Sequence, residues 1–186
     1  MKQILCVLIP LAVITVLMPL LVRRMKREKM MYIAKTMFVI YVACNLYCTV
    51  FSRGSTIESE VVLQPLGSYL RLFDSVPTGG RRVTGVFGVF MNGTLPITGI
   101  ILNILLYYPL GYLLPILFPK LKPKHVILIG CLCSIATEAV QYLLKMGWCE
   151  TDDVIHNTLG TAIGVWVWHL QSKRLNKPKS NELAKD

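Results

Sequence analysis

Long apolar runs separated by short basic clusters follow one another along the chain. The first run, residues 4–22, has 19 residues without a charge, enough to cross a bilayer at about 1.5 Å per helical residue. It follows Lys2, as in a signal peptide, but it lacks a small-residue cleavage site and ends in a basic cluster typical of a retained anchor. The same pattern predicts further spans at residues 30–51, 97–118, 126–146 and 153–170.

These runs predict an all-α fold, a polytopic transmembrane helix bundle with about five spans. Residues 1–52 would hold two amino-terminal transmembrane helices, residues 97–170 a three-helix core, and residues 171–186 a basic cytoplasmic tail. Residues 53–96 mix charged and apolar side chains, which is typical of an amphipathic segment that lies on a membrane. We therefore expect an extracytoplasmic amphipathic or re-entrant segment between the second and third spans.

Composition supports a membrane protein and gives it an orientation. With 54% hydrophobic residues and a mean hydropathy of +0.55, the chain is too apolar for a soluble domain. The net charge of +10 does not indicate nucleic acid, because the basic residues separate apolar runs instead of gathering on one surface. Of 20 Lys and Arg, 13 fall in the loops at 23–29 and 120–124 and in the tail. This bias predicts a membrane protein with its amino terminus outside and its carboxyl terminus in the cytoplasm.

Polar side chains recur at similar depths in the third, fourth and fifth spans. Glu138 is the one acidic residue deep inside a span, roughly 13 Å from its predicted outer end. At that depth we expect it to be protonated and to donate a hydrogen bond to Gln141 or Asn103. We expect one outward-opening polar layer, a candidate ligand-binding site made of Asn103, Glu138, Gln141, Asp152, Asp153, His156 and Asn157.

A simpler interpretation gives these residues a structural role only. Asn103, Glu138, Gln141 and Asn157 would then tie helices together by hydrogen bonds, with Asp152 and Asp153 capping the fifth helix. His156 is more simply explained as an interfacial side chain.

Small residues and prolines predict how the last spans pack. Gly160 and Gly164 share a face of the fifth helix and allow another helix to approach closely. That helix belongs either to this chain or to a partner membrane protein. In the third span, Pro109 and Pro115 each remove a backbone donor, so kinks are expected there. The predicted packing positions are Pro109, Gly111, Gly160 and Gly164.

Enzymatic chemistry is the rival prediction. Glu138 or Asp153 would act as a general base on an envelope lipid, while Gln141 or Asn157 would hold an oxyanion. The chain contains no HExxH or GxSxG motif, and we predict neither a metal nor another cofactor.

Three segments resemble the VanZ family of bacterial membrane proteins. They read NILLYYPLG at 103–111, TEAVQ at 137–141 and DDVIHNTLG at 152–160, with a weaker likeness in VLQPL at 62–66. The firm resemblance covers about residues 99–168. Many members carry an Arg shortly before the paired acids, whereas residues 147–150 of this chain offer none, so the electrostatics of this site differ from theirs.

The resemblance implies a bacterial plasma-membrane protein similar to one associated with low-level resistance to the glycopeptide antibiotic teicoplanin. Joined to the polar layer, it leads to a non-enzymatic envelope protein as our main hypothesis. The expected partners are membrane lipids, with a lipid-linked cell-wall precursor or a lipophilic glycopeptide as the candidate ligand at the outward site. A partner membrane protein is the third alternative.

Overall fold

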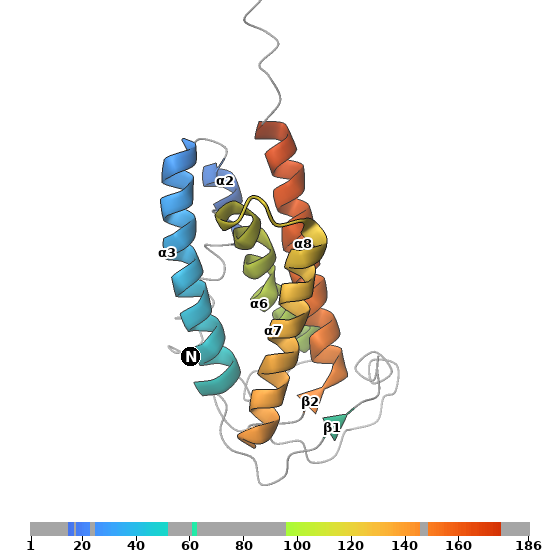
Figure 1. The fold of residues 1–186 in the computed structure, drawn as a ribbon. Coiled ribbons are helices and arrows are strands. Elements are labelled where there is room, and N and C mark those ends of the chain that lie inside the picture. Colours follow the sequence, from blue (N-terminus) through green and yellow to red (C-terminus); the bar gives the residue numbers. More distant parts are fainter. Residues whose placement is uncertain are drawn as a thin grey trace, which may run out of the picture.

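A computed structural model describes residues 15–16, 18–22, 25–51, 61–62, 96–145 and 149–175. In these residues the chain forms a bundle of long helices (Figure 1). They are α3 (Arg27–Leu46), continued by a π-helical turn η2 (Tyr47–Phe51), then α6 (Pro96–Leu117), α7 (Pro123–Leu143) and α8 (Thr151–Leu175), with the short helix α2 (Met18–Val22) beside them. A two-residue parallel pair joins β1 (Val61–Val62) to β2 (Cys149–Glu150). The predicted helical bundle is confirmed, and this small pair is an addition to it.

Three of the described helices are long and apolar enough to cross a membrane. They cover Arg27–Val50, Gly99–Leu117 and Pro123–Leu143, in agreement with the second, third and fourth predicted spans. Most of the first predicted span, and all of residues 53–96 except β1 and Pro96, lie outside the described residues. The fifth predicted span is the helix α8, which is longer than expected at both ends but is less apolar than the other three.

Helix α6 lies at the centre of the bundle. In its membrane-length window 67% of the residues are buried, against 22% for α3 and 28% for α7. A helix that is apolar on all sides belongs in a core, and α6 supplies the largest buried side chains, Tyr107, Tyr112 and Leu113. The exposed apolar residues of α7, such as Leu128 and Leu132, face outward where lipid would surround the bundle.

Glycines bring the helices into backbone contact. A methyl group added at Gly160 or Gly164 would overlap a backbone carbonyl oxygen of α6, and one at Gly111 would overlap the carbonyl of Thr161 in α8. The close approach predicted for Gly160 and Gly164 therefore occurs with α6 of the same chain, which leaves neither glycine free to dock a second protein. Helix α6 continues without a break through Pro109 and Pro115.

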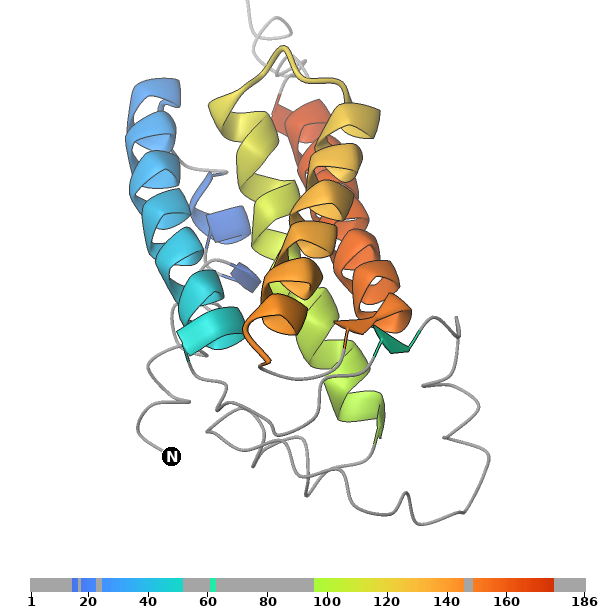
Figure 2. The ribbon, with the colours of Figure 1, turned by 60° about the horizontal axis from the view of Figure 1, so that its bottom comes forward.

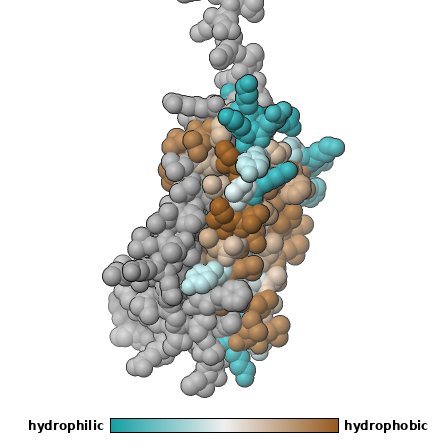
Figure 3. Space-filling view, turned by 90° about the vertical axis from the view of Figure 1, so that its left-hand side faces the viewer, coloured by the Kyte–Doolittle hydropathy of each residue, from teal (hydrophilic) through white to brown (hydrophobic). Residues whose placement is uncertain are grey.

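Charge is distributed unequally between the two ends of the bundle. The start of α3, the loop between α6 and α7, and the last turn of α8 all lie at one end (Figures 1 and 2). Figure 3 shows hydrophilic side chains gathered at this end, with hydrophobic ones along the length below. The basic residues of this end are Lys26, Arg27, Lys29, Lys120, Lys122, Lys124, Lys173 and Arg174. The described parts of the two predicted same-side loops and the start of the predicted tail thus meet at one end, which we call the basic end.

Candidate functional site

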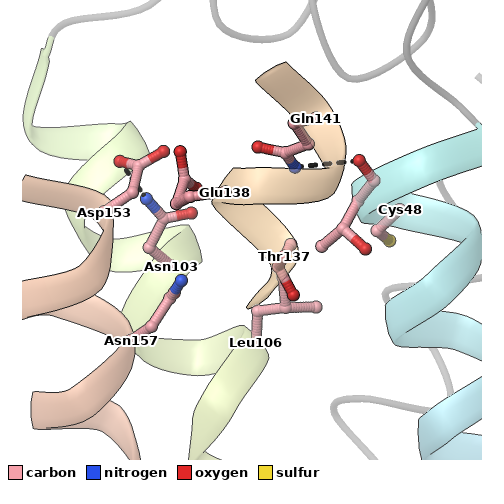
Figure 4. Close-up of a pocket in the computed structure, with 9 residues that line it drawn as sticks. Cys48, Asn103, Leu106, Thr137, Glu138, Gln141, Asp153 and Asn157 are labelled. Atoms are coloured by element: carbon pink, nitrogen blue, oxygen red, sulfur yellow. Dashed lines mark hydrogen bonds between the residues drawn. The ribbon is translucent and has the colours of Figure 1, made fainter. Parts of the chain in front are cut away.

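A small pocket lies between the helices near the end opposite the basic end. It opens among η2, α6, α7 and α8, and Figure 4 shows its side chains converging from these elements. With its opening it encloses about 270 Å³, yet the water-sized space at its centre holds about one water molecule. The lining residues are Cys48, Thr49, Asn103, Leu106, Thr137, Glu138, Gln141, Asp153 and Asn157.

Two amide side chains connect the walls of the pocket. The Asn103 amide nitrogen donates to Asp153 Oδ1 at 2.7 Å and so joins α6 to the first turn of α8. The Gln141 amide nitrogen donates to the backbone carbonyl oxygen of Thr49 at 2.8 Å. Thr49 lies in the last turn of its helix, where carbonyl groups lack an intrahelical partner, so Gln141 satisfies one of them. These bonds fix α6 to α8 and α7 to η2.

Glu138 is buried, with 3% of its surface exposed, and it points toward Asp153 and Asn103 (Figure 4). Its Oε2 accepts a hydrogen bond from the backbone N–H of Glu150 at 3.1 Å. The expected protonation of Glu138 and its hydrogen bond to an amide oxygen of Asn103 or Gln141 stay predictions, because the bonds described above use the amide nitrogens of these two residues. The depth of Glu138 was overestimated: α7 ends at Leu143, which places Glu138 roughly 7 Å from that end.

Asn157 forms the floor of the pocket and is 4% exposed. Its amide nitrogen donates to Ser134 Oγ at 2.8 Å, joining α8 to α7. Its carbonyl oxygen Oδ1 is buried and has no hydrogen-bond partner. The backbone carbonyl of Asn157 accepts the hydroxyl of Thr161 at 3.1 Å, which links the pocket to the packed glycines below it.

The structure brings five of the seven predicted site residues together and separates two. Asn103, Glu138, Gln141, Asp153 and Asn157 all line the pocket. Asp152 and His156, four residues apart on one face of α8, do not line it. His156 is 1% exposed, so the expectation of an interfacial side chain was wrong. The packing positions Gly111, Gly160 and Gly164 lie at the α6–α8 contact, and Pro109 is buried in α6.

Sequence reasoning missed four pocket residues and one supporting residue. Cys48 and Thr49 arrive from η2, and Leu106 and Thr137 are ordinary residues of apolar spans. Ser134 supports Asn157 from outside the pocket. Single hydroxyl residues in spans give no sequence signal, because their hydroxyls routinely bond to the carbonyl four residues earlier, as Thr49 and Thr137 do here.

Cys149 lies in β2, outside the membrane spans, and the pKa of its thiol responds to the negative charge of the pocket. Burial raises the pKa of the Cys149 thiol, and the negative charges of Glu138 and Asp153 raise it further. Only the thiolate is alkylated, so a raised pKa moves the reaction to higher pH.

In a variant that keeps Cys149 as its only cysteine, we expect alkylation by iodoacetamide to need a higher pH than in the unfolded chain. Glu138→Gln should move the midpoint of this pH profile to lower pH, because it removes one of the two charges. Mass spectrometry of the alkylated fraction over a pH series measures the midpoint. The control Glu28→Gln, at the basic end, should leave the midpoint unchanged. If Glu138→Gln also left the midpoint unchanged, the result would contradict a charged Glu138 near Cys149.

The pocket is acidic and rich in hydrogen-bond acceptors. Two carboxylates line it, while the amide nitrogens of Asn103, Gln141 and Asn157 donate to protein acceptors. Within the described ranges, no group of three or more His, Cys, Asp or Glu side chains has the arrangement that holds a metal ion.

The fold and the pocket together define a helical membrane protein with a buried polar site near one end of its bundle. The VanZ/LLP1 family matches residues 38–172, and the chain belongs to this family. The match extends the resemblance of residues 99–168 back through η2 into α3, and η2 supplies the side of the pocket that contains Thr49.

A curated relative and the solved structures complete the comparison. The chain is 29% identical over 79 residues to Protein VanZ of Enterococcus faecium. The aligned stretch covers 41% of this chain and 48% of that protein, so the chain spans about half the length of this relative. No solved structure matches the chain.

Proposed function

We propose that this protein holds part of a cell-envelope molecule in the pocket lined by Glu138 and Asp153, and thereby contributes to resistance to glycopeptides such as teicoplanin. The candidate ligands are a membrane lipid, a lipid-linked cell-wall precursor or a lipophilic glycopeptide. One observation carries the proposal: within the residues that match the family, five of the predicted polar residues come from three helices to line one small pocket.

The hydrogen bonds favour binding over catalysis. An intramembrane enzyme would need Gln141 or Asn157 to donate to an oxyanion. Both amide nitrogens donate to protein acceptors, Gln141 to the Thr49 carbonyl and Asn157 to Ser134. A group already used to join two helices is poorly placed to stabilise a transient charge.

We propose that the pocket end faces the outside of the cell and the basic end the cytoplasm. The support is the gathering of the basic loops at one end, since cytoplasmic loops collect Lys and Arg. In intact cells a membrane-impermeant thiol reagent should then reach Cys149 in the variant that keeps only this cysteine. Protection of Cys149 in intact cells and labelling after lysis would reverse the orientation.

Glu138→Gln should return teicoplanin susceptibility to that of cells lacking the protein, at equal expression. The substitution keeps the shape of the side chain and an oxygen that can accept from the Glu150 N–H, so charge is the main change. The measurement is the minimal inhibitory concentration, with the protein level followed by immunoblot. The matched control Glu28→Gln, an exposed acid of α3, should behave as the unmodified protein. Resistance unchanged by Glu138→Gln would leave the pocket a purely structural role.

A further inference from the structure

The hydrogen-bond donors of the pocket are directed into the protein. The amide nitrogens of Asn103, Gln141 and Asn157 bond to a carboxylate, a backbone carbonyl and a hydroxyl, at 2.7–2.8 Å. All three bonds run between different helices. Each nitrogen gives one of its two N–H groups to such a bond, so a ligand that needs donors, such as a phosphate, would compete with contacts that hold the bundle together.

An acceptor, in contrast, is available. Asn157 Oδ1 is buried with no hydrogen-bond partner, on a side chain that lines the pocket. A buried polar atom without a partner destabilises the fold, so a group that donates to it restores that free energy. The carboxylates of Glu138 and Asp153 line the same space.

We infer that the pocket receives the primary ammonium group of an aminolipid headgroup, such as ethanolamine, and excludes the phosphate. This inference rests on the proposed function of the pocket as a ligand site. An ammonium offers three donors and no acceptor, which matches Asn157 Oδ1 and the neighbouring carboxylates. Its size is close to that of the single water molecule for which the pocket has room.

The position of the pocket selects a lipid as the source of this group. The space admits only the terminal group of a larger molecule, so the rest of the ligand remains outside the pocket. Many exposed residues of α3 and α7 are apolar, among them Val39, Leu128 and Leu132, and would lie against lipid if these helices cross a membrane. An ammonium at the end of a lipid headgroup enters the pocket while its acyl chains stay against those side chains.

The test compares lipids that differ only in the terminal group. Native mass spectrometry of the detergent-solubilised chain would measure single-site retention of phosphatidylethanolamine, phosphatidylcholine, N-acetylated phosphatidylethanolamine and phosphatidylglycerol. Phosphatidylcholine keeps the positive charge but has no N–H donor, and N-acetylation removes the charge. We expect phosphatidylethanolamine to be retained at least about tenfold more tightly than the other three, as hydrogen bonds to a charged donor imply.

Two variants of Asn157 link that preference to the pocket. Asn157→Leu should abolish the preference for phosphatidylethanolamine, whereas Asn45→Leu, which removes an amide of α3 outside the pocket, should preserve it. Because Asn157→Leu also removes the bond to Ser134, Asn157→Asp provides a second test. It keeps an acceptor and adds negative charge, so retention of phosphatidylethanolamine should stay equal or increase; a decrease would contradict the inference.

The outcomes separate the two proposals. Equal retention of phosphatidylethanolamine and phosphatidylcholine would overturn the ammonium inference. A preference for phosphatidylglycerol would also overturn it. If Glu138→Gln abolished that preference for phosphatidylglycerol, the proposed function of the pocket as a lipid site would still stand. If no lipid is preferred and Glu138→Gln also leaves resistance unchanged, both the inference and the proposed function fail.

Discussion

Replacing Gly111 with alanine should destabilise the bundle by about 3 kcal/mol or more, enough to prevent recovery of folded protein. The added methyl group would overlap the backbone carbonyl of Thr161, and neither helix backbone can move without separating α6 from α8. Unfolding by denaturing detergent, followed by circular dichroism, measures the change. Ala139→Val, a larger addition on the exposed face of α7, serves as the control and should change stability by less than about 1 kcal/mol.

Gly130 offers a matched comparison, because an added methyl group there meets the side chain of Thr161 instead of its backbone. Gly130→Ala should therefore be rescued in part by Thr161→Gly, which removes the three nearest atoms. Gly111→Ala should gain nothing from the same second change. Equal rescue of both variants would show that the α6–α8 contact is looser than the structure describes.

Asn103→Leu should be the next most damaging change, costing about 2–3 kcal/mol. It removes the 2.7 Å hydrogen bond to Asp153 and leaves this carboxylate beside an apolar side chain. The same detergent unfolding experiment measures the loss. Asn45→Leu is the control, since the Asn45 amide bonds only weakly, at 3.2 Å, within its own helix.

A double-mutant cycle with Asp153→Leu isolates the Asn103–Asp153 interaction. If the bond stabilises the fold, Asn103→Leu should cost much less in the Asp153→Leu background than in the unmodified chain. Additive losses would assign the effect of Asn103→Leu to packing alone.

The helices were largely predictable because a segment that crosses a lipid bilayer must be a long apolar run, and such runs are visible in the sequence. Long apolar runs predicted the bounds of α6 to within one residue at each end. The end of α7 was not predictable in this way. The helix stops where Lys145 adopts a positive φ of 52°, a conformation that usually indicates glycine, and the run of apolar residues continues past this point. The depth of Glu138 was misjudged for that reason alone.

The candidate site was predictable in five of its nine lining residues but not in its geometry. Helical spacing placed Glu138 and Gln141 on one face, and both line the pocket. Asp152 and Asp153 lie about 100° apart around α8, so only the packing of that helix decides which faces the pocket. The contribution of Thr49 depends on a contact across 92 residues that no local pattern encodes. The pair of β1 with β2, two residues in each strand, is likewise too short to leave a pattern.

Thr161 occupies the point where three helices meet. Its backbone lies against Gly111 of α6, its side chain against Gly130 of α7, and its hydroxyl bonds to the carbonyl of Asn157, one turn from the pocket. Close-packed interiors resist compression and expansion alike. The pocket therefore cannot widen unless this junction loosens. Under the proposed function, the size of the group that fits depends on Thr161, which does not line the pocket.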